Sequence, residues 1–110
     1  MTPEEFARGV AAQRDTALEI YFKDPPTTAV GMQIKALKLN APQMTAFRRI
    51  LSDAMTDMCY ALLLGLDGSA SIGDLTQQQF QLADEEGNVL TGGELEVAAW
   101  EVFHGEEEQQ

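Results

Sequence analysis

Three helix-start signals divide this chain and limit what it can fold into. In each signal, a side chain that can cap a helix is followed three positions later by Glu or Gln, which is the spacing of a capping box. The signals lie at Thr2–Glu5, Asn40–Gln43 and Thr91–Glu94. The first two also place a proline, Pro3 or Pro42, in the first helical turn, where proline is tolerated. The sequence therefore predicts three main helices.

The first two of these helices also have predictable ends. The first is expected to reach about Phe22, because Pro25 and Pro26 disfavour a helical residue before them. The second is expected to stop at Gly65, since glycine readily takes the left-handed conformation that ends a helix. Its apolar residues recur at steps of three and four and predict a central helix with a broad buried face. They are Met44, Phe47, Ile50, Leu51, Ala54, Met55, Met58, Ala61 and Leu62.

Residues 29–36 are ambiguous. Val30, Met32 and Ile34 alternate as in a half-buried strand, whereas Val30, Ile34 and Leu37 share one face of a helix. Residues 33–38 are rich in helix formers, so we favour a short helix. A strand that joins a hairpin remains the alternative.

Residues 79–90 carry the pattern of a β-hairpin. Phe80 and Leu82 alternate with polar residues, Glu86–Asn88 has turn-forming composition, and Val89–Leu90 can return as a second strand. Because a two-stranded hairpin is only marginally stable alone, it must pack on the helices or find further strands.

The predicted fold is therefore a helix-rich α+β domain. It contains two N-terminal helices, a long central helix, a short β-hairpin and a C-terminal helix that ends near His104, before Gly105. A chain of 110 residues has the size of one domain. We expect residues 1–105 to form it and residues 106–110 to be a frayed acidic tail.

Charge is divided unevenly along the chain. All seven lysines and arginines lie in residues 1–49 with five acidic residues, whereas thirteen acidic residues follow, which gives a net charge of −11. A negative potential disfavours nucleic acid and anionic membranes and favours a basic protein partner. The apolar run at 60–64 is too short to span a bilayer.

Cys59 is the only cysteine, so no internal disulfide is possible. The N-terminus lacks the basic and apolar regions of a secretory signal, and we expect a cytoplasmic protein. Cys59 and His104 are the only thiol and imidazole. Burial in an apolar run is the usual role of a cysteine such as Cys59, and a histidine such as His104 is favoured in the last turn of a helix by the helix dipole. We predict no catalytic residue, no cofactor and no enzymatic activity.

Segment 67–74 has the most site-like composition. It presents oxygen ligands at short spacing, but the positions that an EF-hand fills with Gly and Glu hold Ile72 and Gln78. A turn explains these residues equally well. Asp53 and Asp57, one helical turn apart, are expected to be exposed carboxylates, and no metal site is assigned. The candidate ligand residues of the loop are Asp67, Ser69, Ser71 and Asp74.

The final helix carries apolar residues on two sides. The face expected to dock on the core consists of Leu95, Ala98, Ala99, Val102 and Phe103. Val97, Trp100 and His104 lie on the other side. Either the chain covers this second side, or the tryptophan lies in a contact surface, where tryptophan is enriched. An acidic rim would surround it, formed by Glu94, Glu96 and Glu101.

Segment 61–73 reads Ala-Leu-Leu-Leu-Gly-Leu-Asp-Gly-Ser-Ala-Ser-Ile-Gly and is followed by Gln78–Leu82 and Asp84–Asn88. This order of a helix, a Leu-Asp-Gly turn, a hairpin and an acidic helix resembles that of small uncharacterised bacterial proteins. The resemblance covers the C-terminal half and implies a bacterial source with no assigned activity. Some small acidic bacterial proteins of this kind are immunity or antitoxin partners.

These features together predict a non-enzymatic protein-interaction module, immunity-like or regulatory. Its partner is a basic protein or a second copy of the chain, because the basic half of one copy could meet the acidic half of another. The alternative is a small-ligand or metal-binding domain that uses the loop from Asp67 to Asp74.

Overall fold

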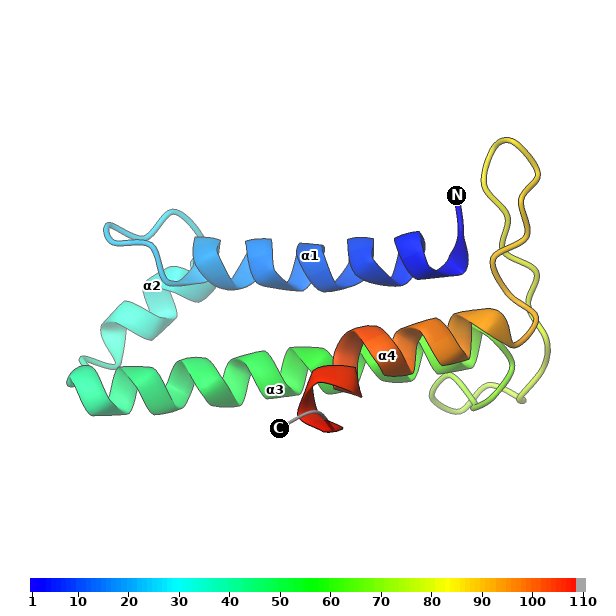
Figure 1. Cartoon of the computed structure of the whole chain (residues 1–110). Helices are drawn as coiled ribbons and strands as arrows, with labels where there is room; N and C mark the ends of the chain where they lie inside the picture. Colours follow the sequence, from blue (N-terminus) through cyan, green and yellow to red (C-terminus); the bar gives the residue numbers. More distant parts are fainter. Residues whose placement is uncertain (109–110) are drawn as a thin grey trace.

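The computed structural model describes the backbone of residues 1–108 and the side chains of residues 1–105. This part of the chain forms four helices: α1 (Pro3–Tyr21), α2 (Ala29–Ala36), α3 (Ala41–Leu66) and α4 (Glu94–Glu108) (Figure 1). Within it, none of the helices has both the length and the apolar character that crossing a membrane requires.

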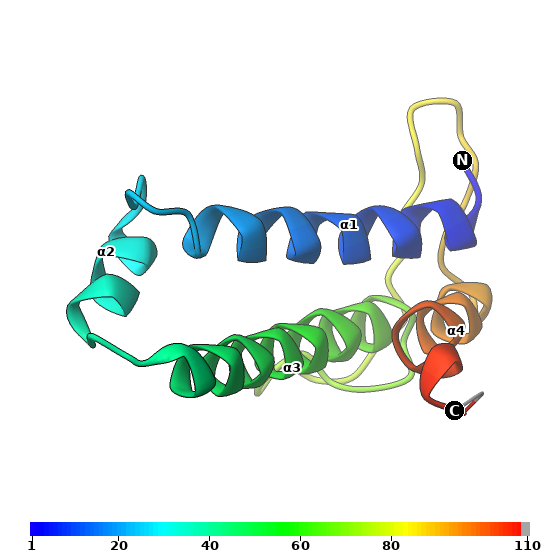
Figure 2. The ribbon, with the colours of Figure 1, turned by 60° about the vertical axis from the view of Figure 1, so that its left-hand side comes forward.

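The helices form a small bundle that is open at one end. α1 runs antiparallel to α3, α2 connects them at one end, and α4 returns along the C-terminal half of α3 (Figures 1 and 2). The core lies where α1, α3 and α4 meet. Its buried residues are Ala7, Leu63, Leu95, Ala98, Ala99 and Phe103.

Local caps explain where the first three helices begin. The Thr2 hydroxyl accepts a hydrogen bond from the Glu5 N–H (3.1 Å), and Asn40 and Gln43 form a complete reciprocal capping box (2.9 and 3.0 Å). Thr28 caps α2 in the same way through the Gly31 N–H (3.0 Å). The predicted first and central helices are confirmed, and the ambiguous segment 29–36 is a helix rather than a strand.

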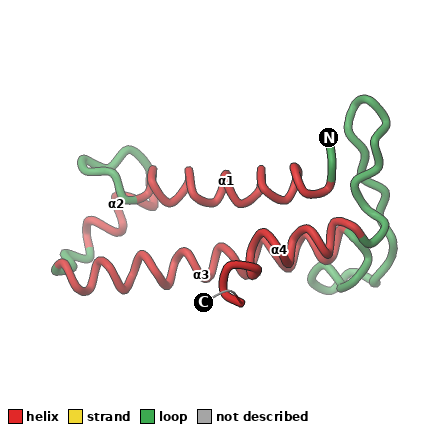
Figure 3. The backbone as a smooth tube through the Cα atoms, viewed as in Figure 1, coloured by secondary structure: helices red, strands yellow, loops and turns green. Residues whose placement is uncertain are grey.

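The predicted β-hairpin is wrong, and with it the α+β class: residues 1–108 contain no strand (Figure 3). Residues 79–90 do turn back on themselves, but they form only an isolated bridge between Ala83 and Val89. Asp84 holds the turn by accepting hydrogen bonds from the Glu86 and Asn88 backbone N–H groups (3.0 and 2.9 Å). No third strand is available in the described chain to extend the bridge into a sheet. The alternation of apolar and polar residues was therefore not enough to produce strands.

Asp84 is also the point at which this loop contacts α1. The amino group of Met1 donates a 2.8 Å hydrogen bond to its carboxylate. That contact, followed by the hydrogen bonds from Asn88, holds the pKa of Asp84 well below its ordinary value.

Two helix ends differ from their predicted positions. α3 continues through Gly65 to Leu66, and the left-handed residue is Gly68, with φ +82°. Gly65 is needed for another reason, since a Cβ there would overlap the Ile72 side chain that packs over it. α4 continues through Gly105 to Glu108, so the predicted tail is helical as far as the backbone is described, and residues 109 and 110 lie outside the described chain.

The predicted broad buried face of the central helix is only half correct. Met44, Phe47, Leu51 and Met55 are partly buried. The remaining members of the predicted face are exposed to solvent: Ile50, Ala54, Met58, Ala61 and Leu62.

Candidate interaction surface

The outer face of α4, defined by Val97, Trp100 and His104, is open to solvent. Val97 is 58% exposed and Trp100 42% exposed, although both residues lie in the middle of a helix. Leu95, Ala98, Ala99 and Phe103 occupy the opposite side of α4 and are buried against α1 and α3. The described residues therefore cover α4 on one side only and do not enclose the tryptophan.

Trp100 and His104 belong to an aromatic cluster completed by Tyr60 of α3. The His104 ring lies 4.7 Å from the Tyr60 ring and 4.9 Å from the Trp100 ring, centroid to centroid, and Tyr60 lies 6.4 Å from Trp100. Burial, with the nearby negative charge of Glu96, raises the pKa of the Tyr60 hydroxyl. These contacts fix the orientation of the indole, so that Trp100 is exposed but ordered.

Carboxylates surround this face. A hollow of about 240 Å³ between the start of α1 and α4 is lined by Val97 and by three acidic side chains, Glu4, Glu94 and Glu101. Arg8 pairs with Glu4 (2.6 Å), whereas the other two acids form no ion pair among the described residues. In the same part of the chain, no lysine or arginine of residues 1–49 pairs with an acidic residue of 53–105. Among the described residues, the only ion pair between the two halves joins the Met1 amino group to Asp84, so the lysines and arginines do not neutralise the predicted charge imbalance there.

Asp67, predicted as a candidate ligand, lies inside the fold as the cap of α4. It is 2% exposed, and its carboxylate accepts hydrogen bonds from the backbone N–H groups of Gly92, Gly93 and Glu96 (2.5–3.0 Å). Thr91, the cap that the sequence motif predicts, instead accepts from the Leu82 N–H (3.1 Å). Local sequence reasoning missed this long-range cap. The available signal was the Gly92-Gly93 pair, which leaves the start of the helix without a neighbouring side-chain cap.

The structure separates the other proposed ligand residues. The Ser69 hydroxyl donates to Glu96 (2.6 Å), while Ser71 and Asp74 are exposed. Asp53 and Asp57 are exposed on α3. Within the described residues, no group of three or more His, Cys, Asp or Glu side chains is arranged to hold a metal ion.

Cys59 and His104 are each accounted for by packing. Cys59 is partly buried against the hydrophobic core, and His104 makes an edge-on contact with Tyr60 and a tilted contact with Trp100 in the aromatic cluster.

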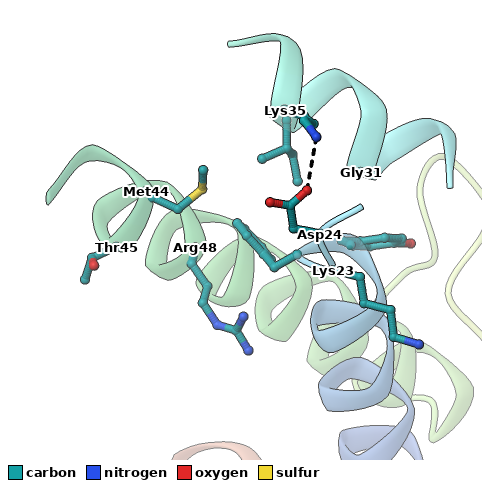
Figure 4. Close-up of a pocket in the computed structure, with 10 residues that line it drawn as sticks. Lys23, Asp24, Gly31, Lys35, Met44, Thr45 and Arg48 are labelled. Atoms are coloured by element: carbon teal, nitrogen blue, oxygen red, sulfur yellow. Dashed lines mark hydrogen bonds and ion pairs between the residues drawn. The ribbon is translucent and has the colours of Figure 1, made fainter. Parts of the chain in front are cut away.

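A pocket of about 290 Å³ lies at the other end of the molecule, between α1, α2 and α3 (Figure 4). Its lining is largely apolar, with Lys23, Lys35 and Arg48 at the edge. Lys35 pairs with Asp24 (3.1 Å), and the Arg48 guanidinium lies 5.0 Å from the centre of the Phe22 ring. These contacts hold together the junction of the three helices. The three basic side chains give this junction its positive charge.

No protein family matches this sequence, and no curated protein or solved structure is significantly similar to it.

Proposed function

We propose that this chain is a non-enzymatic protein-interaction module, immunity-like or regulatory, that binds a basic segment of a protein partner on the outer face of α4. The observation that carries the proposal is the exposed pair of Val97 and Trp100 beside unpaired carboxylates. An ordered apolar anchor within a charged rim is the usual composition of a binding hot spot.

The chemistry of the surface favours a cationic partner. Glu94 and Glu101 would attract lysine or arginine side chains, and the rings of Trp100 and Tyr60 offer faces for cation–π contacts. The tilted contact between these two rings restrains the indole, which lowers the entropic cost of binding.

The single tryptophan of the chain gives a direct test. A short peptide of alternating lysine and leucine, titrated into the protein, is expected to change Trp100 fluorescence and to bind more weakly as salt is added. A peptide of alternating glutamate and leucine is expected to produce no saturable change. Val97→Ser, which keeps the fluorophore, is expected to weaken binding of the basic peptide.

A matched pair of variants separates local recognition from general attraction between opposite charges. Glu94→Gln/Glu101→Gln and Glu85→Gln/Glu86→Gln remove the same number of charges, but the second pair lies in the loop around Asp84. We expect the first pair to raise the Kd about 3- to 10-fold and the second to change it less. Equal weakening by both pairs would exclude the outer face of α4 as the binding site.

A further inference from the structure

A row of exposed apolar residues lies along α3. We call the exposed residues Ile50, Ala54, Met58, Ala61 and Leu62 the α3 ridge. Ile50 and Met58 are 64% and 63% exposed, and they lie eight positions apart, so they share one face of the helix. Contiguous exposed apolar surface of this kind marks a contact site.

Apolar groups lie next to the ridge at both of its ends. Seven positions before Ala54, Phe47 lines an apolar hollow of about 260 Å³ with Val30 and Leu37 of the α2 region. Seven positions after Met58, Gly65 is covered by Ile72 of the following loop. Because a spacing of seven returns to the same helical face, the ridge lies between these two apolar groups.

The monomer itself buries little. Among the described residues, nine apolar residues are buried, three of them alanines, whereas eleven large apolar side chains are exposed. The radius of gyration is 16.5 Å, compared with about 13 Å for a compact domain of this length. The ridge is a face that the described residues leave uncovered.

We propose that a second copy of this chain covers the α3 ridge in a symmetric, antiparallel dimer. The arrangement of charge along the molecule favours this occupant. Exposed cations occur in and beside α2 and near the start of α3, and exposed acids occur in the loop after α3 and at the start of α4. Figure 1 shows that these two groups of segments lie at opposite ends of the molecule. The dipole of α3 adds to this separation, because its positive end lies at the basic end of the molecule and its negative end at the acidic end. Antiparallel packing places the basic end of each copy beside the acidic end of the other, whereas parallel packing would bring like charges together.

The side chains of the ridge also complement themselves in this orientation. In an antiparallel pair centred near residue 56, Met58 of one copy lies opposite Ala54 of the other, and Ile50 lies opposite Leu62. A large side chain then faces a small one at the centre, which lets two helices approach closely. The apolar residues of the ridge are separate from Val97 and Trp100, so the dimer does not depend on that apolar pair, whereas the charge of Glu94 at the start of α4 contributes to both surfaces.

Molecular mass in solution tests the proposal. Over a hundredfold range of concentration, sedimentation equilibrium is expected to show a species of twice the 12.1 kDa chain mass. Met58→Asp is expected to raise the dimer Kd by roughly a hundredfold or more, because the symmetric contact would bury two unpaired carboxylates. Met32→Asp is the matched control, since Met32 is 59% exposed on α2 and does not belong to the ridge.

Cross-linking tests the orientation without depending on these variants. In a Cys59→Ser background, Ile50→Cys and Leu62→Cys are expected to form a disulfide when the two proteins are mixed. Neither should cross-link alone, because an antiparallel pair holds the two copies of residue 50 about 18 Å apart along the helix axis. A wild-type monomer at every concentration, equal weakening by Met58→Asp and Met32→Asp, or a cross-link between two copies of residue 50 would each overturn the proposal.

Discussion

Asp67 joins the end of α3 to the start of α4 through a single carboxylate. We expect Asp67→Ala to lower the free energy of unfolding by about 2–4 kcal/mol, because it removes a buried helix cap and leaves three backbone N–H groups without their acceptor. Asp67→Asn keeps one acceptor oxygen and should cost less. Urea denaturation at neutral pH measures both variants.

The control for this prediction is Asp74→Ala, which removes an exposed carboxylate from the same loop. Surface changes of this kind shift stability by about 0.5 kcal/mol or less. If Asp67→Ala were as mild as Asp74→Ala, the cap would contribute little to the fold.

At the scale of helices, the two glycines within α1 and α3 should respond in opposite ways to alanine. Gly9→Ala is expected to stabilise the protein by about 0.5–1 kcal/mol, because alanine favours the helix and nothing lies within 4 Å of the added Cβ. Gly65→Ala is expected to destabilise it by about 1–3 kcal/mol, since the Cβ would displace Ile72. Urea denaturation provides the comparison.

A double variant tests the cause. If the clash with Ile72 is responsible, Gly65→Ala should cost less in an Ile72→Ala background than in the wild type. An unchanged cost would show that the substitution acts through some other contact.

The same scale shows what the sequence could predict. Caps at Thr2 and Asn40 act within four residues, so α1 and α3 begin where predicted. The cap of α4 comes from Asp67, more than twenty residues away, and no local pattern contains that information. The hairpin prediction was wrong because alternation at residues 79–90 indicates which side chains could share one face of a strand but does not show whether neighbouring strands exist.

The candidate site was predicted in part. Periodicity separated Val97 and Trp100 from the core face of α4, and the structure leaves both exposed. Periodicity also marked the α3 ridge as apolar but assigned it to the core. A helix pattern identifies an apolar face without showing whether the same chain has enough material to cover it.

At the scale of the whole molecule, the unneutralised charge should make stability depend on salt. The net charge is −11, and the described residues contain four ion pairs, all with exposed members. Exposed pairs are worth about 0–1 kcal/mol each, so repulsion among the acids is the larger effect. We expect sodium chloride to raise the Tm at pH 7 by about 5 °C, the shift that about 1 kcal/mol produces in a domain of this size.

The distance over which charges repel one another explains the size of the expected rise in Tm. In 0.01 M salt charges interact over about 30 Å, a distance comparable with the 46 Å length of the molecule, whereas at 1 M they interact over about 3 Å. Acids of the loop after α3 and of α4 therefore repel one another at low salt.

Glu85→Gln/Glu94→Gln/Glu101→Gln should raise the Tm at low salt and reduce its rise with added salt. Because salt also screens the charges that favour the proposed dimer, thermal unfolding is measured on the Met58→Asp variant at one low, fixed protein concentration, where association contributes least. A Tm that falls as salt is added would mean that attraction between the basic and acidic ends outweighs the repulsion within the acidic end.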